Sequence, residues 1–334
     1  MLTKKRTLDA FFKQPAKKAK VPEDSDAEKL AGNLSSPDQK LESSEHPTYP
    51  FPIPAFPAAV SSELASLPST IGREIKDQAD LDLLYFEPYI PKYLERQVFQ
   101  FLRSELPFYR VEYKIKRGGV ETQVRTPRYT TVFGLDETSR FGEKGELIDV
   151  KTGEKIGNDK FYLKYPPRPI PKCLDDLRLS TEAATGCKFN FCLVNYYASG
   201  SDSISYHSDD ERFLGTLPAI ASFSLGARRD FLMKHKIVAP NDNTPPPLET
   251  KPIKLALASG DMLLMRGSTQ ANWLHSIPKR TGKNADDGGR INITFRRAMV
   301  KGGTENYYNY NVGIGGVFKW NAGSREMEPW KASS

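Results

Sequence analysis

The feature that most limits the possible folds of this chain is a series of short, β-rich segments in its second two thirds. These segments are rich in Val, Ile, Thr, Tyr and Phe, and turn-forming residues separate them. They are Val111 to Ile115, Tyr129 to Phe133, Lys188 to Ala198, Ile220 to Leu225, Arg229 to Lys234, Ile253 to Ala258, Met262 to Met265 and Arg290 to Arg297. The pattern predicts a mostly β fold with supporting α-helices, either a β-sandwich or a jelly-roll-like barrel.

Helical periodicity is confined to two segments. The first runs from Pro91 to Leu106, and the second lies near Leu174 to Gly186. Within the first, the residues expected to face inward are Tyr93, Val98, Phe101 and Leu102.

The first 75 residues differ in composition from the rest of the chain. They contain a basic start, an acidic and polar stretch from Glu23 to Glu45, and a proline-rich run from His46 to Pro57. Such a segment buries too little apolar surface to offset its chain entropy. The sequence therefore predicts a disordered tail at residues 1–75 and one folded domain at residues 76–334.

The formal net charge of +7 is concentrated at the N-terminus. Residues 1–20 hold seven basic residues and one acidic residue, which leaves +1 for the other 314 residues. Nucleic-acid binding by the folded part would therefore use local patches. Three cysteines make no disulfide framework and favour a reducing compartment. No apolar run is long enough to predict a membrane span, and the start lacks the apolar core of a secretory signal.

A candidate metal site lies in the segment Tyr206 to Glu211. His207 and Asp209 are two residues apart, so in an extended chain both project to the same side. A second histidine, His275, follows 66 residues after Asp209. Two histidines and one carboxylate leave three positions open on iron(II), whereas a closed zinc site needs a fourth protein ligand. Taken alone, His-x-Asp is also typical of a surface turn.

A candidate anion site lies in the segment Arg290 to Arg297, whose residues alternate strictly in polarity. Arg290, Asn292, Thr294 and Arg296 share one face of the expected strand, opposite Ile291, Ile293 and Phe295. If the polar face is buried, its arginines need an anion, and a dicarboxylic acid suits the guanidinium geometry. The alternative is a half-exposed strand with ordinary surface arginines.

The segment from Phe189 to Tyr197 has a complementary pattern. Phe189, Phe191 and Leu193 form an apolar row that ends in Asn195 and Tyr197. These two polar groups are expected to face the same cavity as the arginines. The alternative places them at the edge of the core.

Five segments together resemble the AlkB family of nucleic-acid dealkylases, and most closely its eukaryotic DNA-repair branch. They are Phe189-Asn-Phe with Asn195-Tyr-Tyr197, His207-Ser-Asp-Asp-Glu211, Ile220 to Gly226 with Arg229, Gly267 to His275, and Arg290 to Arg296. The resemblance extends over roughly residues 105–300. It implies a double-stranded β-helix fold and the oxidative removal of alkyl groups from nucleic-acid bases. The implied cofactors are Fe(II), 2-oxoglutarate as cosubstrate, and O2.

The resemblance also implies roles for single residues. It makes His207, Asp209 and His275 the iron ligands, which are also the catalytic residues. It makes Arg290 the partner of the distal carboxylate of 2-oxoglutarate, and Arg296 the partner of the carboxylate next to the keto group. The supporting cosubstrate contacts are expected from Asn195, Tyr197 and Asn292.

The substrate implied by the family carries a positive charge when adenine or cytosine is methylated at a ring nitrogen. Asp210 and Glu211 follow the expected iron ligand directly, and a carboxylate facing the base would favour the cationic form. The alternative is that Asp210 pairs only with Arg212 or Arg229.

Two basic segments are expected to hold the DNA backbone around a flipped base. The first is Lys114 to Gly119 with Arg125 and Arg128, which resembles the hairpin that recognises nucleotides in this family. Near Val120, a small residue stands where the family carries a bulky wedge. The second segment comprises Arg228, Arg229, Lys234 and Lys236, and the expected stacking residues are Tyr129 and Tyr162.

The N-terminal tail contains two further motifs. Lys5 to Phe12 resembles the peptide that docks on replication sliding clamps, with Leu8, Phe11 and Phe12 as the hydrophobic plug. The basic clusters at residues 4–6 and 17–20 resemble a bipartite nuclear import signal. The alternatives are an inconsequential amphipathic turn and nonspecific attraction to phosphate.

The sequence thus predicts a nuclear DNA dealkylase. Three other functions stay open: an RNA demethylase, a protein hydroxylase with the same iron core, and a catalytically silent, clamp-tethered nucleic-acid-binding protein. The clamp-like tail favours DNA over RNA, and the complete His, Asp, His set favours an enzyme.

Overall fold

The computed structural model describes residues 42–117, 119–157, 159–237, 249–280, 288–313 and 315–332. Its main element is a ten-stranded sheet in which every neighbouring pair is antiparallel. In spatial order the strands are β20 (Glu326–Pro329), β19 (Val317–Asn321), β5 (Phe108–Tyr109), β8 (Tyr129–Gly134), β11 (Phe191–Tyr197), β18 (Arg290–Arg296), β13 (Ile220–Gly226), β16 (Met262–Met265), β4 (Leu83–Phe86) and β3 (Arg73–Ile75).

A second, four-stranded antiparallel sheet carries part of the site. Its strands in spatial order are β12 (Ile204–His207), β17 (Trp273–Ile277), β14 (Arg229–His235) and β15 (Ile253–Leu257). Three hairpins complete the described strands: β1 (Ser43–Ser44) with β2 (Ile53–Pro54), β6 (Glu112–Arg117) with β7 (Val120–Arg125), and β9 (Ser139–Phe141) with β10 (Leu147–Asp149).

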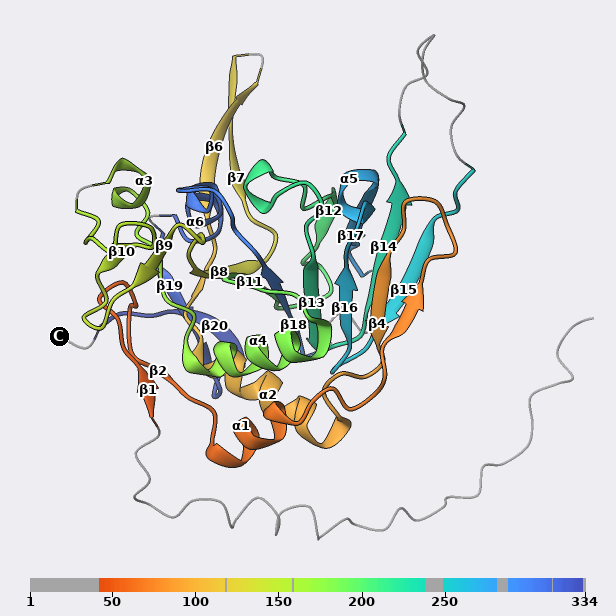
Figure 1. Cartoon of the computed structure of the whole chain (residues 1–334), viewed down its shortest axis with the longest axis horizontal. Coiled ribbons are helices and arrows are strands. Elements are labelled where there is room, and N and C mark those ends of the chain that lie inside the picture. Colours follow the sequence, from red (N-terminus) through yellow and green to blue (C-terminus); the bar gives the residue numbers. More distant parts are fainter. Residues whose placement is uncertain are drawn as a thin grey trace, which may run out of the picture. The chain divides into compact units, whose positions relative to one another are not determined.

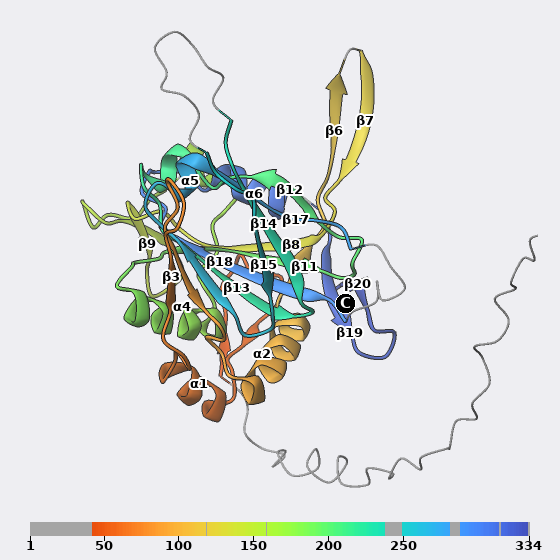
Figure 2. The same ribbon diagram turned by 90° about the vertical axis from the view of Figure 1, so that its right-hand side faces the viewer.

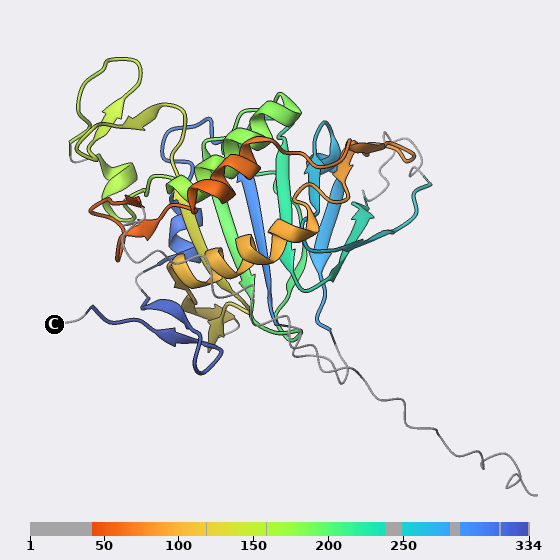
Figure 3. The same cartoon turned by 90° about the horizontal axis from the view of Figure 1, so that it is seen from below.

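Helices cover one face of the large sheet. They are α1 (Ala58–Ala65), α2 (Lys92–Glu105) and α4 (Lys172–Thr185), which lie across the sheet in Figures 1 and 3. Four shorter helical segments are α3 (Lys160–Leu163), the 3₁₀ turn η1 (Arg212–Leu214), α5 (Thr269–Asn272) and α6 (Glu305–Asn311).

Strand alternation divides the core into two layers. On β18, Ile291, Ile293 and Phe295 pack toward the helices in one buried cluster. The other cluster lies on the opposite side of the large sheet and includes Leu193 of β11 and Phe231 of β14. The polar residues of β18 therefore face the second sheet, as the alternating sequence predicts. The mostly β, helix-supported architecture is confirmed.

The two expected helices form where periodicity places them, with one residue assigned to the wrong face. Pro91 precedes α2, and Gly186 ends α4 at a φ of 70°, a conformation that glycine adopts without strain. The buried stripe of α2 contains Leu94, Val98 and Leu102, spaced four residues apart. Tyr93 is 71% exposed, so its predicted inward position is wrong.

The predicted tail boundary at residue 75 is wrong. Residues 42–75 include β1, β2, α1 and β3, and Ile53, Phe56, Val60 and Leu64 are buried in the helix-side core. The apolar residues between the prolines supply this packing. The clamp-like residues Leu8, Phe11 and Phe12 and the basic clusters lie outside the described residues. Within the described part of the chain, no helix has the length and apolar character to cross a membrane.

A buried carboxylate joins α4 to β11. Glu182 accepts hydrogen bonds from the Phe189 backbone N–H (2.8 Å), the Arg178 guanidinium (2.7 Å) and the Lys188 ammonium (2.9 Å). Burial opposes its ionisation, but these donors outweigh burial and lower the pKa of Glu182.

We expect Glu182→Ala to lower the free energy of unfolding by about 2 kcal/mol, because it leaves the buried Phe189 N–H without an acceptor and removes one of the two carboxylates that pair with Arg178. A group with a lowered folded-state pKa stabilises above its unfolded pKa and loses that effect as pH falls. The difference in unfolding free energy between the wild type and Glu182→Ala should therefore shrink below roughly pH 4. Urea unfolding at several pH values measures it, with the exposed Glu154→Ala as control. A deficit that persists at low pH would contradict the charge-based part of this account.

Candidate metal centre

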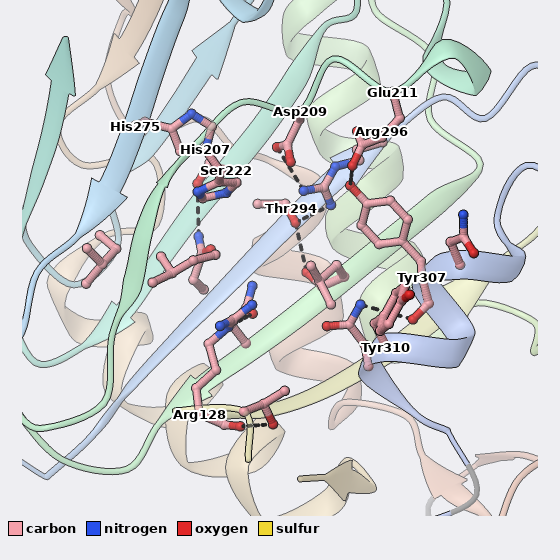
Figure 4. Close-up of a pocket in the computed structure, with 18 of the residues that line it drawn as sticks. Arg128, His207, Asp209, Glu211, Ser222, His275, Thr294, Arg296, Tyr307 and Tyr310 are labelled. Carbon is pink, nitrogen blue, oxygen red and sulfur yellow. Dashed lines mark hydrogen bonds and ion pairs between the residues drawn. The ribbon is translucent and has the colours of Figure 1, made fainter. Parts of the chain in front are cut away.

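Three side chains from two distant segments of the sequence converge at the edge of the second sheet, where β12 pairs with β17. His207 ends β12, Asp209 follows it, and His275 lies on β17, paired in register with His207. One ligand atom from each residue lies within 4.8 Å of the others. Figure 4 shows the three side chains grouped at one end of the cavity. The three residues that the sequence predicts to form one metal site therefore lie together, as that prediction requires.

Hydrogen bonds and burial prepare these groups to bind a cation. The Nδ1–H of His207 donates to the Ser205 carbonyl (2.9 Å), which leaves Nε2 available as a ligand. Burial and the neighbouring His207 lower the pKa of His275 to about 3, so its imidazole is neutral. The His275 Nδ1 atom is buried without a hydrogen-bond partner. The Gln270 side chain accepts a bond from the Asp209 backbone N–H (2.9 Å) and holds this segment in place.

Asp209 is ionised despite its burial. Its side chain is 5% exposed and lies 2.8 Å from the Arg296 guanidinium. Burial raises the pKa of Asp209, but the charge and hydrogen bond of Arg296, together with the two neighbouring histidines, outweigh burial, and the pKa falls to about 2. Two imidazole nitrogens and one carboxylate leave part of a metal's coordination sphere open.

The polar face of β18 lines the same cavity, and several nitrogen atoms of its two arginines have no hydrogen-bond partner. Arg290 is 1% exposed and donates from Nη2 to Ser224 Oγ (2.7 Å), while its Nε and Nη1 have no hydrogen-bond partner. Burial lowers the pKa of Arg290 to about 10. Arg296 donates to Thr294 Oγ1 and Asp209, and its Nε has no partner. Buried, partly unpaired guanidinium groups indicate an anionic ligand.

The expected cosubstrate contacts line the same cavity, whose volume is about 1060 Å³. Asn292 donates to Ser222 Oγ (2.9 Å) and the Phe223 carbonyl (2.8 Å). Asn195 Oδ1 accepts from Arg128 Nε (2.6 Å). Tyr197 is 1% exposed, and its ring lies 5.4 Å from the Arg290 guanidinium carbon. The alternatives of a surface strand and of a core edge do not hold for these residues.

The expected base-contacting residues are only partly brought to the cavity. Glu211 and Arg128 line it, and Glu211 accepts a hydrogen bond from Tyr307 (2.8 Å). Asp210 is half exposed, does not line the cavity, and pairs with Lys236 at 2.6 Å rather than with either expected arginine. Its predicted position at the base edge is not the one that the structure shows.

Tyrosine stacking was predicted at the wrong positions. Tyr162 is buried in α3, where its hydroxyl donates to Asp136 (2.8 Å), and it does not line the cavity. Tyr129 is also buried and packs edge-on against Phe318. Arg229 was expected on the DNA surface, but it is 2% exposed and donates to the carbonyls of Asp202 and Pro278. All three residues are buried and stabilise the folded domain instead of contacting a base or the DNA surface.

The expected hairpin forms and extends away from the body of the domain (Figures 1 and 2). Its residues Tyr113 and Val124 line the cavity. Arg125 pairs across its strands with Glu112 (3.3 Å), and Lys114 pairs with Glu121 (2.6 Å). Both pairs are solvent-exposed, so each stabilises the hairpin little. Val120, next to the turn, is 66% exposed.

Sequence reasoning assigned no role to the C-terminal segment, yet α6 lines the cavity with Tyr307 and Tyr310 (Figure 4). The Tyr307 ring lies 5.2 Å from the Arg296 guanidinium carbon. The two tyrosines are three residues apart, which puts them on one face of a helix. That spacing in Tyr307-Tyr-Asn-Tyr310 was the available signal, but it did not indicate which surface the face would contact.

Comparison with known proteins covers the part of the chain that holds the three metal-ligand candidates and the two buried arginines. The family model of the 2OG-Fe(II) oxygenase superfamily matches residues 82–296. The DNA oxidative demethylase ALKBH2 of Homo sapiens is 38% identical over 138 residues, which are 41% of this chain and 51% of that protein. The alpha-ketoglutarate-dependent dioxygenase alkB homolog 3 of Rattus norvegicus is 40% identical over 144 residues, 40% of this chain and 45% of that protein.

A plant relative aligns over a longer stretch. The DNA oxidative demethylase ALKBH2 of Arabidopsis thaliana is 30% identical over 230 residues, which are 65% of this chain and 67% of that protein. The chain spans about half the length of the human and rat relatives.

Proposed function

The chain belongs to the 2OG-Fe(II) oxygenase superfamily, and from that premise we propose that it is a DNA oxidative demethylase. The proposed reaction removes alkyl groups from bases such as N1-methyladenine and N3-methylcytosine and releases formaldehyde and succinate. One observation carries the proposal: a single cavity holds the His207, Asp209 and His275 cluster together with two buried arginines that have unpaired nitrogens. The printed names of the relatives support DNA as the substrate.

The residues present are suited to the cofactors of the superfamily. His207, Asp209 and His275 would hold Fe(II), and the unpaired nitrogens of Arg290 and Arg296 would bind the two carboxylates of 2-oxoglutarate. Bound iron with 2-oxoglutarate and O2 would supply the oxidation of the alkyl carbon. The chain itself would orient the cosubstrate, because Tyr197 packs beside the Arg290 guanidinium and Ser224 Oγ accepts a hydrogen bond from it, which holds the guanidinium in place. Asn292 lines the same cavity.

We further propose that Glu211, which lines the cavity, faces the cationic base, while Lys236 holds Asp210 outside it. A carboxylate near the base favours a methylated, positively charged ring over a neutral one. The target base must leave the stack to reach this cavity. Arg128 at the cavity, with Arg125 and Val120 on the projecting hairpin, would contact the strand around it.

The tail motifs lead to two proposals about cellular context. The basic clusters at residues 4–6 and 17–20 would direct the protein to the nucleus. Leu8, Phe11 and Phe12 would dock on a replication sliding clamp and deliver the enzyme to newly copied DNA. A peptide of residues 1–20 should bind a purified sliding clamp, and replacing both phenylalanines with alanine should end that binding.

The activity is tested by measuring formaldehyde and succinate from oligonucleotides that carry N1-methyladenine or N3-methylcytosine. We expect both products in equal amounts from methylated DNA, and none when Fe(II) or 2-oxoglutarate is omitted. A matched RNA oligonucleotide and a peptide mixture distinguish the alternative substrates. Faster turnover on RNA would replace the DNA assignment. Oligonucleotide binding without any product would instead indicate a silent binding protein.

A further inference from the structure

Two tyrosines from distant parts of the sequence meet where the cavity opens to solvent. Tyr113 lies on β6 and Tyr310 on α6, and both line the cavity. Their ring centroids are 6.0 Å apart, and the ring planes are inclined by 67°. Tyr113 is 38% exposed and Tyr310 is 52% exposed. The pair therefore presents aromatic surface to solvent at the cavity.

The position of these rings differs from that of the two neighbouring tyrosines on α6, Tyr307 and Tyr308. Tyr308, two residues before Tyr310 on α6, is buried in the core between the sheets. Tyr307 is occupied by its hydrogen bond to Glu211. The proposed iron ligands Asp209 and His275 are buried, whereas Tyr113 and Tyr310 are not. The exposed pair therefore lies on the solvent side of the cavity, away from the reacting groups.

The surroundings of the pair suit a nucleic-acid strand. Tyr113 belongs to the hairpin β6–β7, which projects from the body of the domain (Figures 1 and 2) and carries the exposed cations Lys114, Lys116 and Arg125. Lys114 and Arg125 are held only by exposed ion pairs, which phosphate groups can replace at little cost. Proteins that bind single strands combine such cations with aromatic rings on which bases stack.

We propose that Tyr113 and Tyr310 form a stacking platform for the nucleobase adjacent to the target base on the DNA strand. The proposal rests on the proposed function for the identity of the ligand. Tyr310 keeps about half of its surface exposed despite its contact with Tyr113, and nucleobases stack on exposed aromatic rings whatever their sequence. The platform holds the strand while the methylated base enters the cavity.

The test compares Tyr310→Ala with the unaltered full-length protein in binding to a short single-stranded DNA. The probe carries N1-methyladenine with the fluorescent base 2-aminopurine as its immediate neighbour. Stacking on the platform should quench 2-aminopurine on binding. We expect Tyr310→Ala to weaken binding about tenfold and to remove the quenching, as expected for the loss of one base stack. Tyr310→Trp should retain both.

A matched control distinguishes stacking from a general loss of aromatic surface. Tyr93 on α2 is 71% exposed and does not line the cavity, so Tyr93→Ala should leave binding and quenching unchanged. A probe with an abasic site in place of the neighbouring base should bind the wild type and Tyr310→Ala equally. If Tyr310→Ala does not fold, Tyr113→Ala provides the same comparison.

Unchanged affinity and unchanged quenching in Tyr310→Ala would overturn the platform. Formaldehyde release from the same probe reports separately on the proposed function. If the wild type releases formaldehyde and Tyr310→Ala changes neither affinity nor quenching, the platform is rejected and the demethylase proposal stands. Tyr310-dependent binding without any release would reject the demethylase and keep the platform.

Discussion

His207→Ala is expected to reduce formaldehyde release from methylated DNA by more than about 100-fold and to leave oligonucleotide binding intact. The imidazole supplies one of only three proposed protein ligands, and even the loss of residues that support such ligands costs 10- to 100-fold. His207 is only half-buried and lies at the end of a strand, so the fold should survive its truncation. Product formation and oligonucleotide affinity are measured on the same preparation.

Metal retention gives this prediction a readout that does not depend on turnover. Iron bound per chain after anaerobic loading should fall sharply in His207→Ala. His235→Ala is the matched control, because His235 lies on β14 of the same sheet, pairs with Asp80 at 3.1 Å and does not line the cavity. If His207→Ala keeps both its iron and its turnover, the proposed metal centre is wrong.

Arg290→Met is expected to weaken 2-oxoglutarate binding by about 100-fold while raising the thermal stability of the protein in the absence of 2-oxoglutarate. Loss of a buried, charge-assisted contact to a carboxylate typically costs 2–5 kcal/mol of binding energy. In the unliganded protein the same guanidinium is a buried cation with two unpaired nitrogens, and an apolar side chain of similar size removes that penalty. The two effects have opposite signs, so they cannot both arise from misfolding.

Thermal unfolding with and without 2-oxoglutarate measures both effects. A ligand that binds only the native state raises the unfolding temperature with its concentration, and Arg290→Met should lack that rise. Arg297→Met is the matched control, since Arg297 is exposed beyond the end of β18 and pairs with Glu137 at 2.7 Å. An unchanged 2-oxoglutarate-dependent rise in Arg290→Met would assign the diacid to another site.

Local spacing in the sequence predicted the central strands β8, β11, β13, β16 and β18, the helices α2 and α4, and the placement of His207 beside Asp209. It did not predict α1, nor the strands β12 and β17 that bring His275 next to His207. The alternation in Arg290 to Arg296 places its arginines on one face because successive residues of a strand point to opposite sides. The same geometry brings His207 and Asp209 together. Tyr93 was assigned to the buried face because it is aromatic and lies one residue from Leu94 of the buried stripe of α2. In the structure its ring lies at the surface, where its hydroxyl donates a hydrogen bond to Glu63.

The boundary of the folded domain was not predictable from composition alone. The proline-rich run after His46 resembles an unfolded linker, but Ile53 and Phe56 find apolar partners on helices and strands elsewhere in the chain. Chain entropy is offset only when those partners are present, and composition does not show them. Asp210 was misassigned for a related reason, because Lys236 draws its carboxylate away from the cavity.

The sequence by itself determined which residues carry the proposed chemistry, because metal-binding and anion-binding side chains follow strand periodicity over a few residues. Only the tertiary structure decided which other residues line the cavity around these side chains. Tyr310 of α6 meets Tyr113 of the hairpin 197 positions away, and Glu211 rather than Asp210 lines the cavity. These contacts depend on how whole elements pack, and packing is set by surfaces that are distant in the chain and leave no local pattern.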